Sequence, residues 1–385
     1  ALPIYDWEYA PGGRPHLYPP LIHLLIALCS LPFRGDTLEG MRLLQATMLP
    51  LAHLTTWYMV RRFFDAPRAF LTVLILGTDF FFPMAALMAL PSIFANILQP
   101  LLLVAFLTRR LWPAAGLTAL TLYAHMGVAP LLLLSLLLFS LLDRRYLPFF
   151  LIMAGIGIVL ALPWYAHVIM YRDWLGHPMR GVMPAWQSAL FKPFWLLMVN
   201  VVILLLAFRG FRMIRWRDAR NKLIAAQLLG FLPMFVSYGG RYFAHTAPLW
   251  AAVAAVPLAP LLQGPRRRRF AAAAVGLAFV PILLFGGMGG TGPPVLRPMV
   301  SGWMLVPAVA MSRGGGMAGP GENPAVATPE VRALADYVRR HTDPNQIVHA
   351  GPATNLALMV GFHAGRRIDT AAWPEVRKPE TASRA

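Results

Sequence analysis

Long apolar stretches alternate with short basic runs along most of this chain. Between consecutive basic runs, the apolar length is sufficient for two bilayer-spanning helices of about 16 to 22 residues each. Because basic loops stay on the cytoplasmic side of a membrane, these runs predict an orientation for the helices between them. The runs are Arg61, Arg62 and Arg68; Arg109 and Arg110; Arg144 and Arg145; Arg209 to Lys222; and Arg266 to Arg269.

This pattern predicts an all-α polytopic membrane protein with about ten transmembrane helices and one more helix that lies in the membrane interface. An even number of crossings returns the chain to its starting face. Residues 1–42 and 288–385 are therefore expected to share the extracytoplasmic side. The predicted spans are 43–60, 69–85, 93–108, 111–126, 127–142, 147–166, 192–208, 222–238, 242–263 and 269–287.

The apolar residues 17–33 have two interpretations. As a further span they would place Arg61 and Arg62 outside and invert every later loop. We therefore interpret them as a helix in the outer interface, and a plain spanning helix remains the alternative.

The C-terminal part changes character. Residues 288–327 have the glycine- and proline-rich composition of a linker. Thr328, Pro329 and Glu330 then form a typical helix start, which predicts a helix over 329–341, and residues 347–352 are typical of a short strand. The expected parts are an outer loop with the interfacial helix (1–42), a helical bundle (43–287), the linker (288–327) and a small extracytoplasmic α/β element (328–385).

Composition supports this membrane assignment. The chain is 58% hydrophobic and 13% charged, whereas soluble domains have about 25% charged residues. The net charge of +18 is explained by the basic loops, so no nucleic-acid partner is expected. The single cysteine excludes a disulfide framework. The expected location is the cell (cytoplasmic) membrane.

The N-terminal segment has the densest candidate chemistry. Asp6 and Glu8 are two residues apart beside a Pro-Gly-Gly turn, where their carboxylates can share a divalent cation, Mg²⁺ or Mn²⁺. Such an ion can neutralise a phosphate leaving group. The same two acids are also candidate catalytic residues. Acids at this spacing are equally common on ordinary solvated loops, and this alternative stays open.

Further candidates lie at predicted outer positions. Asp79 is either a functional acid within a span or a residue at the water boundary. Arg241, at a predicted outer span end, is suited to binding a lipid phosphate, with Tyr242 and His245 at helical spacing behind it. The alternative is an arginine that snorkels to the interface. The candidates for a substrate loop are Arg14, His16 and Arg180, whereas His23, His53 and His125 are interpreted as packing residues.

The segment YDWEYAPGGRPHLYPPLIHLL at 5–25 resembles the first outer loop of membrane glycosyltransferases of the GT-C class, notably the catalytic subunit of oligosaccharyltransferase. Residues 42–62, 121–139, 239–254 and 331–352 are similar to later parts of that family. The resemblance implies transfer of a sugar or glycan from a polyprenyl phosphate or diphosphate to an acceptor on the outer face. It also implies that acidic loop residues hold a metal or act as base.

Some positions depart from the family pattern. Asp6 matches the later aspartate of the outer loop, while the family's principal acid lies farther upstream, so we expect an additional N-terminal segment. Ser92 stands where relatives carry an acid, and Asp79 is the nearest substitute. The Trp-Trp-Asp motif is absent, which argues against a protein sequon as acceptor.

The resulting hypothesis is a membrane glycosyltransferase with a polyprenyl-phosphate-linked sugar donor, membrane lipid as surroundings and an unidentified acceptor. One alternative is a catalytically inactive GT-C-like membrane protein, because expected acids are missing. Another is a lipid or solute transporter, although such folds favour repeated halves, and we find none in the sequence.

Overall fold

The computed structural model describes residues 4–5, 14–77, 79, 82, 91–174, 203–263, 265–271, 273, 329–348, 360–361 and 364–368. They are mostly helical and belong to two compact units. Unit 1 comprises residues 1–18, 163–182 and 309–385, and unit 2 comprises 19–162 and 183–308. Within the described residues, Arg144–Met170 is the one segment both long and apolar enough to cross a membrane, and several shorter apolar helices have 10 to 17 residues.

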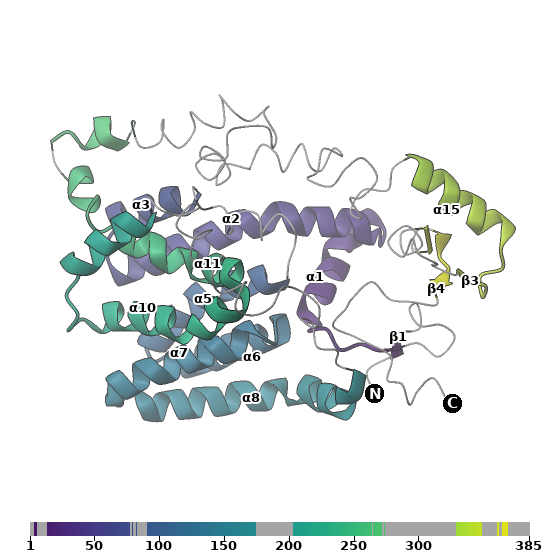
Figure 1. The fold of residues 1–385 in the computed structure, drawn as a ribbon, viewed down its shortest axis with the longest axis horizontal. Coiled ribbons are helices and arrows are strands. Elements are labelled where there is room, and N and C mark those ends of the chain that lie inside the picture. The colour runs from purple at the N-terminus through teal and green to yellow at the C-terminus, as the bar shows by residue number, and fades with distance from the viewer. Residues whose placement is uncertain are drawn as a thin grey trace. The chain divides into compact units, whose positions relative to one another are not determined.

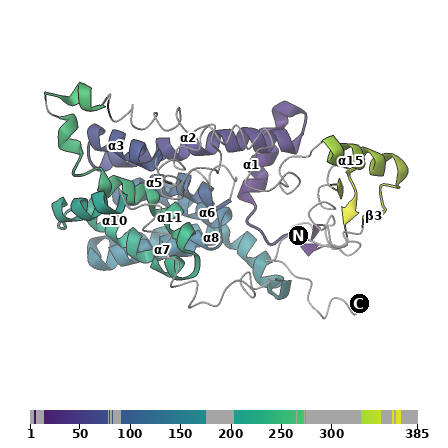
Figure 2. The ribbon, with the colours of Figure 1, turned by 45° about the horizontal axis from the view of Figure 1, so that its top comes forward.

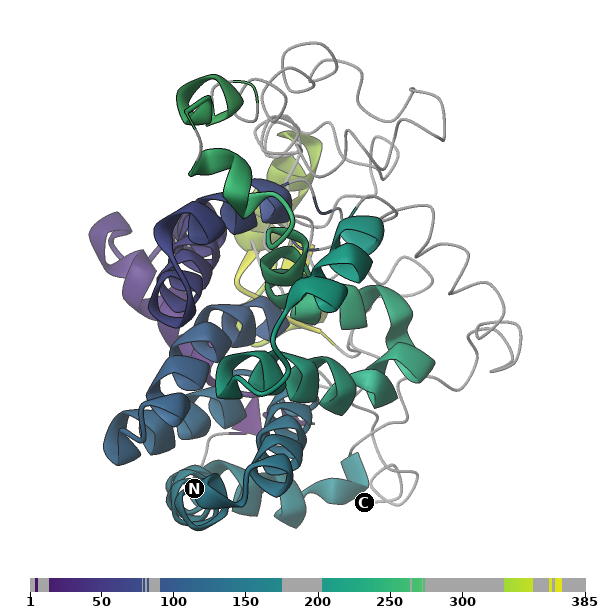
Figure 3. The same cartoon turned by 90° about the vertical axis from the view of Figure 1, so that its left-hand side faces the viewer.

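Unit 2 is a bundle of helices. In Figure 1, α2, α8 and α10 run lengthwise in a common direction, and Figure 3 shows many helices of this unit nearly end-on. The bundle contains α1 (Leu21–Ser30), η1 (Leu31–Phe33), α2 (Thr37–Phe63), α3 (Ala66–Gly77), α5 (Pro91–Leu107), α6 (Leu111–Ala124), α7 (Val128–Leu142), η2 (Arg144–Tyr146), most of α8 (Leu147–Met170), a helix over 203–213, α10 (Ala219–Gly230), α11 (Leu232–Ala254) and η4 (Ala259–Leu262).

The first helices confirm part of the sequence analysis. The apolar stretch 17–33 contains α1 and η1, and α1 packs along α2. Its position in a membrane interface stays a prediction. α2 and α3 lie side by side (Figures 1 and 2), and α5, α6 and α7 begin and end within two residues of the predicted spans 93–108, 111–126 and 127–142.

The helix break near residue 240 was predicted at the wrong place. Spans were expected at 222–238 and 242–263, but α10 ends at Gly230 and α11 runs without interruption from Leu232 to Ala254. Pro233 explains the true break, because proline is tolerated in the first turn of a new helix and disrupts a helix interior. Arg241 consequently lies within α11, not at the end of a span.

The helix predicted over 69–85 is also shorter than expected. α3 ends at Gly77, and the Asp79 carboxylate accepts a hydrogen bond from the Phe82 backbone nitrogen at 2.7 Å. A carboxylate that bonds the backbone three residues ahead is typical of a capping position, which interrupts a continuous helix.

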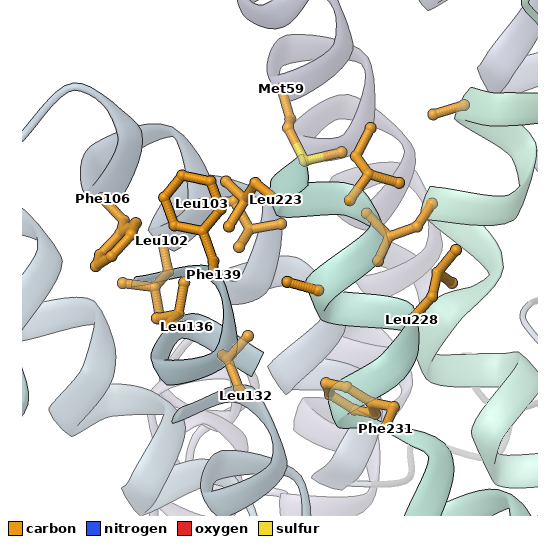
Figure 4. Close-up of a cluster of buried hydrophobic side chains, with 14 of the residues drawn as sticks. Met59, Leu102, Leu103, Phe106, Leu132, Leu136, Phe139, Leu223, Leu228 and Phe231 are labelled. Atoms are coloured by element: carbon orange, nitrogen blue, oxygen red, sulfur yellow. The ribbon is translucent and has the colours of Figure 1, made fainter. Parts of the chain in front are cut away.

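The hydrophobic core of unit 2 fills the space between α2, α5, α7 and α10. Phe106, Phe139 and Phe231 are fully buried in it, and Figure 4 shows them with leucines from the same helices. Where α7 meets α10, a Cβ added to Gly230 would lie 2.2 Å from the Ser135 hydroxyl oxygen. The absence of a side chain at Gly230 therefore permits the close approach of these two helices.

Unit 1 contains short strands and one strongly amphipathic helix. β1 (Ile4–Tyr5) pairs antiparallel with β2 (Arg14–Pro15), and β3 (Ile347–Val348) pairs parallel with β4 (Arg367–Ile368). The remaining elements are the last turns of α8, η3 (Arg172–Trp174) and α15 (Pro329–His341). α15 has the bounds that its cap residues predict, and β3 confirms a short strand beginning at Ile347.

Arg366 closes the C-terminal end of α15. Its buried guanidinium donates to the backbone oxygens of Arg339 at 2.8 Å and Thr342 at 2.7 Å, and also to the Thr342 hydroxyl at 2.8 Å. The last carbonyls of a helix lack partners within the helix, and here a charged side chain supplies them.

Candidate functional site

A buried polar pair joins α5 to α11 inside unit 2. The Asn96 amide nitrogen donates to the Ala244 backbone oxygen at 2.9 Å, and the Asn96 side-chain oxygen lies 2.7 Å from His245 Nδ1. Asn96 is 0% exposed and His245 is 1% exposed. Burying polar groups costs free energy unless they are hydrogen-bonded, so this pair fixes how the two helices pack.

The hydrogen bonds assign the protons of two histidines. The Asn96 amide nitrogen donates to Ala244, so the Asn96 oxygen faces His245 and His245 Nδ1 carries a proton. His125 has the opposite arrangement. Its Nδ1 accepts from the backbone nitrogens of Gly127 and Val128, each at 3.1 Å, so its proton is on Nε2.

These two imidazoles are neighbours. The ring centroids of His125 and His245 are 6.4 Å apart, and the planes are inclined by 49°. His125, at the C-terminal end of α6, and His245, within α11, therefore bring two imidazole rings close together. Imidazole nitrogens can bind a phosphate or a hydroxyl group.

Asp79 lies elsewhere in the same unit, beyond the end of α3. It is 2% exposed, and Phe82, which it caps, packs its ring against His53 of α2 with centroids 5.6 Å apart. His53 Nδ1 in turn donates to the Leu49 backbone oxygen at 2.9 Å, which holds this ring on its own helix. The carboxylate of Asp79 is thus buried rather than exposed at a surface.

The other sequence candidates divide into two groups. Tyr242 is 4% exposed, and its hydroxyl donates to the Leu228 backbone oxygen at 3.3 Å, which ties α11 to α10. His16 belongs to unit 1, where its ring lies 5.9 Å from that of Trp164. Asp6, Glu8 and Arg180 lie outside the described residues, as do the side chains of Arg14 and Arg241.

No cluster of three or more His, Cys, Asp or Glu side chains suited to a metal ion occurs within the described part of the chain. The metal-binding hypothesis concerns Asp6 and Glu8, which are outside that part. It therefore remains a prediction from their spacing.

Asn96 was not identified from the sequence, and His125 was interpreted as a packing residue. A signal was available for Asn96, because an amide within an otherwise apolar helix must find a hydrogen-bond partner on a neighbouring helix. The sequence does not identify that partner, since His245 is 149 positions away.

No protein-family model and no curated protein sequence matches this chain. Its fold matches the crystal structure of ArnT from Cupriavidus metallidurans in the apo state, with a TM-score of 0.63 and 16% identity over 92% of this chain and 75% of ArnT. For ArnT bound to undecaprenyl phosphate, the TM-score is 0.60 and the identity 15%, over 91% of this chain and 75% of ArnT.

The archaeal oligosaccharyltransferase AglB from Archaeoglobus fulgidus, in complex with an inhibitory peptide and a dolichol-phosphate, matches with a TM-score of 0.56 and 13% identity. The match covers 97% of this chain and 58% of AglB, so this chain spans little more than half of the archaeal enzyme. ArnT and AglB are GT-C glycosyltransferases. The resemblance to the GT-C class that the sequence motifs indicated is therefore confirmed at the level of fold.

Proposed function

We propose that this chain is a multi-pass membrane glycosyltransferase that moves a sugar or glycan from a polyprenyl phosphate or diphosphate to an acceptor on the extracytoplasmic face. The observation that carries the proposal is the fold shared with ArnT over 92% of the chain. ArnT has been crystallised with undecaprenyl phosphate and AglB with a dolichol-phosphate. A polyprenyl phosphate is thus the ligand chemistry common to both relatives of the fold.

The topology proposed with this function is the one that the basic runs predict. About ten helices cross the membrane, and the basic loops lie in the cytoplasm. The N-terminal loop and the C-terminal element then share the outer face. A lipid-linked donor would reach the protein from within the bilayer, with its phosphate at the level of the outer interface.

The proposed reaction is a displacement at the anomeric carbon. An acceptor oxygen forms a bond to that carbon while the bond to the lipid phosphate oxygen breaks, and a carboxylate takes the acceptor proton. Asp6, Glu8 and Asp79 are the proposed acids for this step. The departing phosphate carries the developing negative charge, and Arg241, Tyr242 and His245 are its proposed ligands.

The Asn96–His245 hydrogen bond supports the proposed role of His245. Because Asn96 holds Nδ1 at 2.7 Å, the ring orientation is fixed before any donor binds. In the proposed role Nε2 is protonated as well, because only the imidazolium ring has a second N–H to donate to the phosphate. A group held in this way stabilises charge without a reorganisation cost during the reaction. The Tyr242 hydroxyl already donates its one hydrogen to the Leu228 oxygen, so it can donate to a phosphate only by leaving that oxygen.

Asp6 and Glu8 are the proposed ligands of Mg²⁺ or Mn²⁺. A divalent ion held by these carboxylates would neutralise charge on the phosphate. Arg14, His16 and Arg180 are proposed to contact the substrate from the outer loops.

The test uses the complete natural protein, with any upstream residues, in lipid nanodiscs. A labelled polyprenyl-phosphate sugar is added with Mg²⁺ or Mn²⁺ and a membrane extract that supplies acceptors, and release of the lipid phosphate is followed. We expect release by the wild type and a loss of at least about tenfold for His245→Ala, as for other lost charge-stabilising donors. His23→Ala, a change at an exposed histidine of α1, is the matched control.

Two other results would contradict the proposal, and each would favour one of the alternative functions. If the donor stays intact with every variant and metal, the inactive GT-C-like alternative is favoured. If labelled lipid crosses the membrane of a proteoliposome without cleavage, the transporter alternative is favoured.

A further inference from the structure

Unit 2 contains a cavity of about 510 Å³ at its basic end. It lies where the C-terminal ends of α2 and α5 meet η2 and the start of α10. The predicted cytoplasmic runs Arg61–Arg62, Arg109–Arg110, Arg144–Arg145 and Arg209–Lys222 all belong to this end of the bundle. Its lining residues on α5, Val104 and Leu107, lie at least two helical turns beyond Asn96 along the same helix.

The polar side of the cavity has an excess of positive charge. Arg62 and Arg220 both line it, with Asp218 as the carboxylate. Asp218 is already engaged, because it accepts the Arg220 backbone nitrogen at 2.9 Å and caps α10. Arg220 is positioned through a hydrogen bond to the Phe63 backbone oxygen.

Arg62 differs from the neighbouring arginines. It is exposed and makes no hydrogen bond or ion pair within the described part of the chain. Arg61, one residue earlier, lies over the Trp57 ring at 5.0 Å. Arg109 lies over the Tyr146 ring at 4.5 Å and donates to the Arg145 backbone oxygen. Arg62 is thus a guanidinium at the cavity that is available to an anion.

Apolar residues also line the cavity. Phe63 is 2% exposed and Val104 is 6% exposed, and Leu107 lines the cavity beside them. The Tyr146 hydroxyl, which also lines it, donates to the Leu107 backbone oxygen at 3.3 Å. The lining consequently combines two arginines with apolar side chains, a combination suited to an anionic group with hydrocarbon attached.

We propose that this cavity binds a phosphate-bearing anion, whose phosphate is contacted by Arg62 and Arg220. Arginine is well suited to such a ligand, because the planar guanidinium donates two parallel hydrogen bonds to phosphate oxygens. The anion is either the headgroup of an anionic phospholipid or free phosphate, since both have the same chemistry at the arginines. The site does not depend on the proposed transferase activity.

The experiment measures binding to the purified protein by native mass spectrometry. One arm titrates short-chain phosphatidylglycerol, with zwitterionic phosphatidylcholine as the comparison of zero net charge, and the other titrates inorganic phosphate. Arg62→Gln should weaken binding about fivefold or more, the usual effect of one basic residue on an anionic headgroup. Arg61→Gln removes the same charge one residue away and should change binding by less than about twofold.

A second variant tests the cavity without changing charge. Ala219 lines the cavity at the start of α10, and Ala219→Leu should weaken binding by filling the space. Arginine-dependent binding of phosphatidylglycerol alone supports a lipid headgroup, and equal dependence in both arms supports the phosphate group as the whole ligand. Equal effects of Arg62→Gln and Arg61→Gln, or full binding by Ala219→Leu, would overturn the proposal.

Discussion

The contact of α10 with α7 allows a sharp prediction for Gly230→Ala. The added Cβ would lie 2.2 Å from the Ser135 hydroxyl oxygen, 2.7 Å from its Cα and 2.8 Å from its Cβ. Ser135 is 0% exposed. Rotating the serine side chain would move only the hydroxyl oxygen, so the two helices must move apart to admit the methyl group.

Two opposing effects set the size of the change. Replacing glycine by alanine in a helix gains about 0.5–1 kcal/mol of propensity. Forcing an extra carbon into a well-packed core costs about 1–3 kcal/mol. Because the clash includes backbone atoms of α7, we expect the packing cost to exceed the gain. Gly230→Ala should lower the free energy of unfolding by about 1–2 kcal/mol.

Thermal unfolding in detergent measures this effect, with Gly116→Ala as the matched control. A Cβ on Gly116, which lies within α6, meets nothing within 4 Å, so this variant should be as stable as the wild type or more stable. Adding Ser135→Gly to Gly230→Ala should restore part of the loss, because it removes the serine Cβ and hydroxyl. A Gly230→Ala protein as stable as the Gly116→Ala protein would refute the assigned approach of α7 and α10.

Further predictions concern the polar contacts. Asn96→Leu leaves the buried His245 Nδ1–H without its acceptor and should cost about 1–3 kcal/mol in thermal or denaturant unfolding; an unchanged midpoint would contradict the pairing. Arg145 donates two hydrogen bonds to Asp143 and holds the pKa of that carboxyl below its usual range. The ionised Asp143 carboxylate therefore contributes its full stabilisation above about pH 4, and this contribution is lost as pH falls through the lowered pKa of the folded state. Below about pH 4, the Tm of the wild type should consequently decline more steeply than the Tm of Asp143→Asn. Arg366→Leu should speed hydrogen exchange in the last turn of α15, which loses its guanidinium partner; unchanged exchange there would argue against the cap.

The sequence predicted well those helices whose ends carry local signals. α5 ends before Arg109 and Arg110, α6 begins after them, and α7 ends before Arg144 and Arg145, so the basic runs indicated these bounds. α15 has a proline at its first position, and its start was located correctly. The division between α10 and α11 was missed because Gly239 and Gly240 resemble a turn. The backbone is helical at both glycines, and the break lies before Pro233.

The candidate site was harder to predict from the sequence, because it depends on contacts between segments that are far apart along the chain. His245 was identified because it follows Arg241 and Tyr242 in a motif, but its orientation depends on Asn96 of another helix. Likewise, the cavity at Arg62 exists only because α2 and α5 end where α10 begins. Periodicity within one helix contains no information about such contacts between distant segments.

A reaction of the complete protein with a radiolabelled polyprenyl-phosphate sugar tests the transferase activity most directly. The protein is in lipid nanodiscs with Mg²⁺ or Mn²⁺, and a membrane extract supplies candidate acceptors. We predict that labelled sugar leaves the lipid, that free polyprenyl phosphate accumulates in equal amount, and that His245→Ala slows both by at least about tenfold. An intact donor after prolonged incubation with excess wild-type protein would contradict the assignment of this chain as a glycosyltransferase.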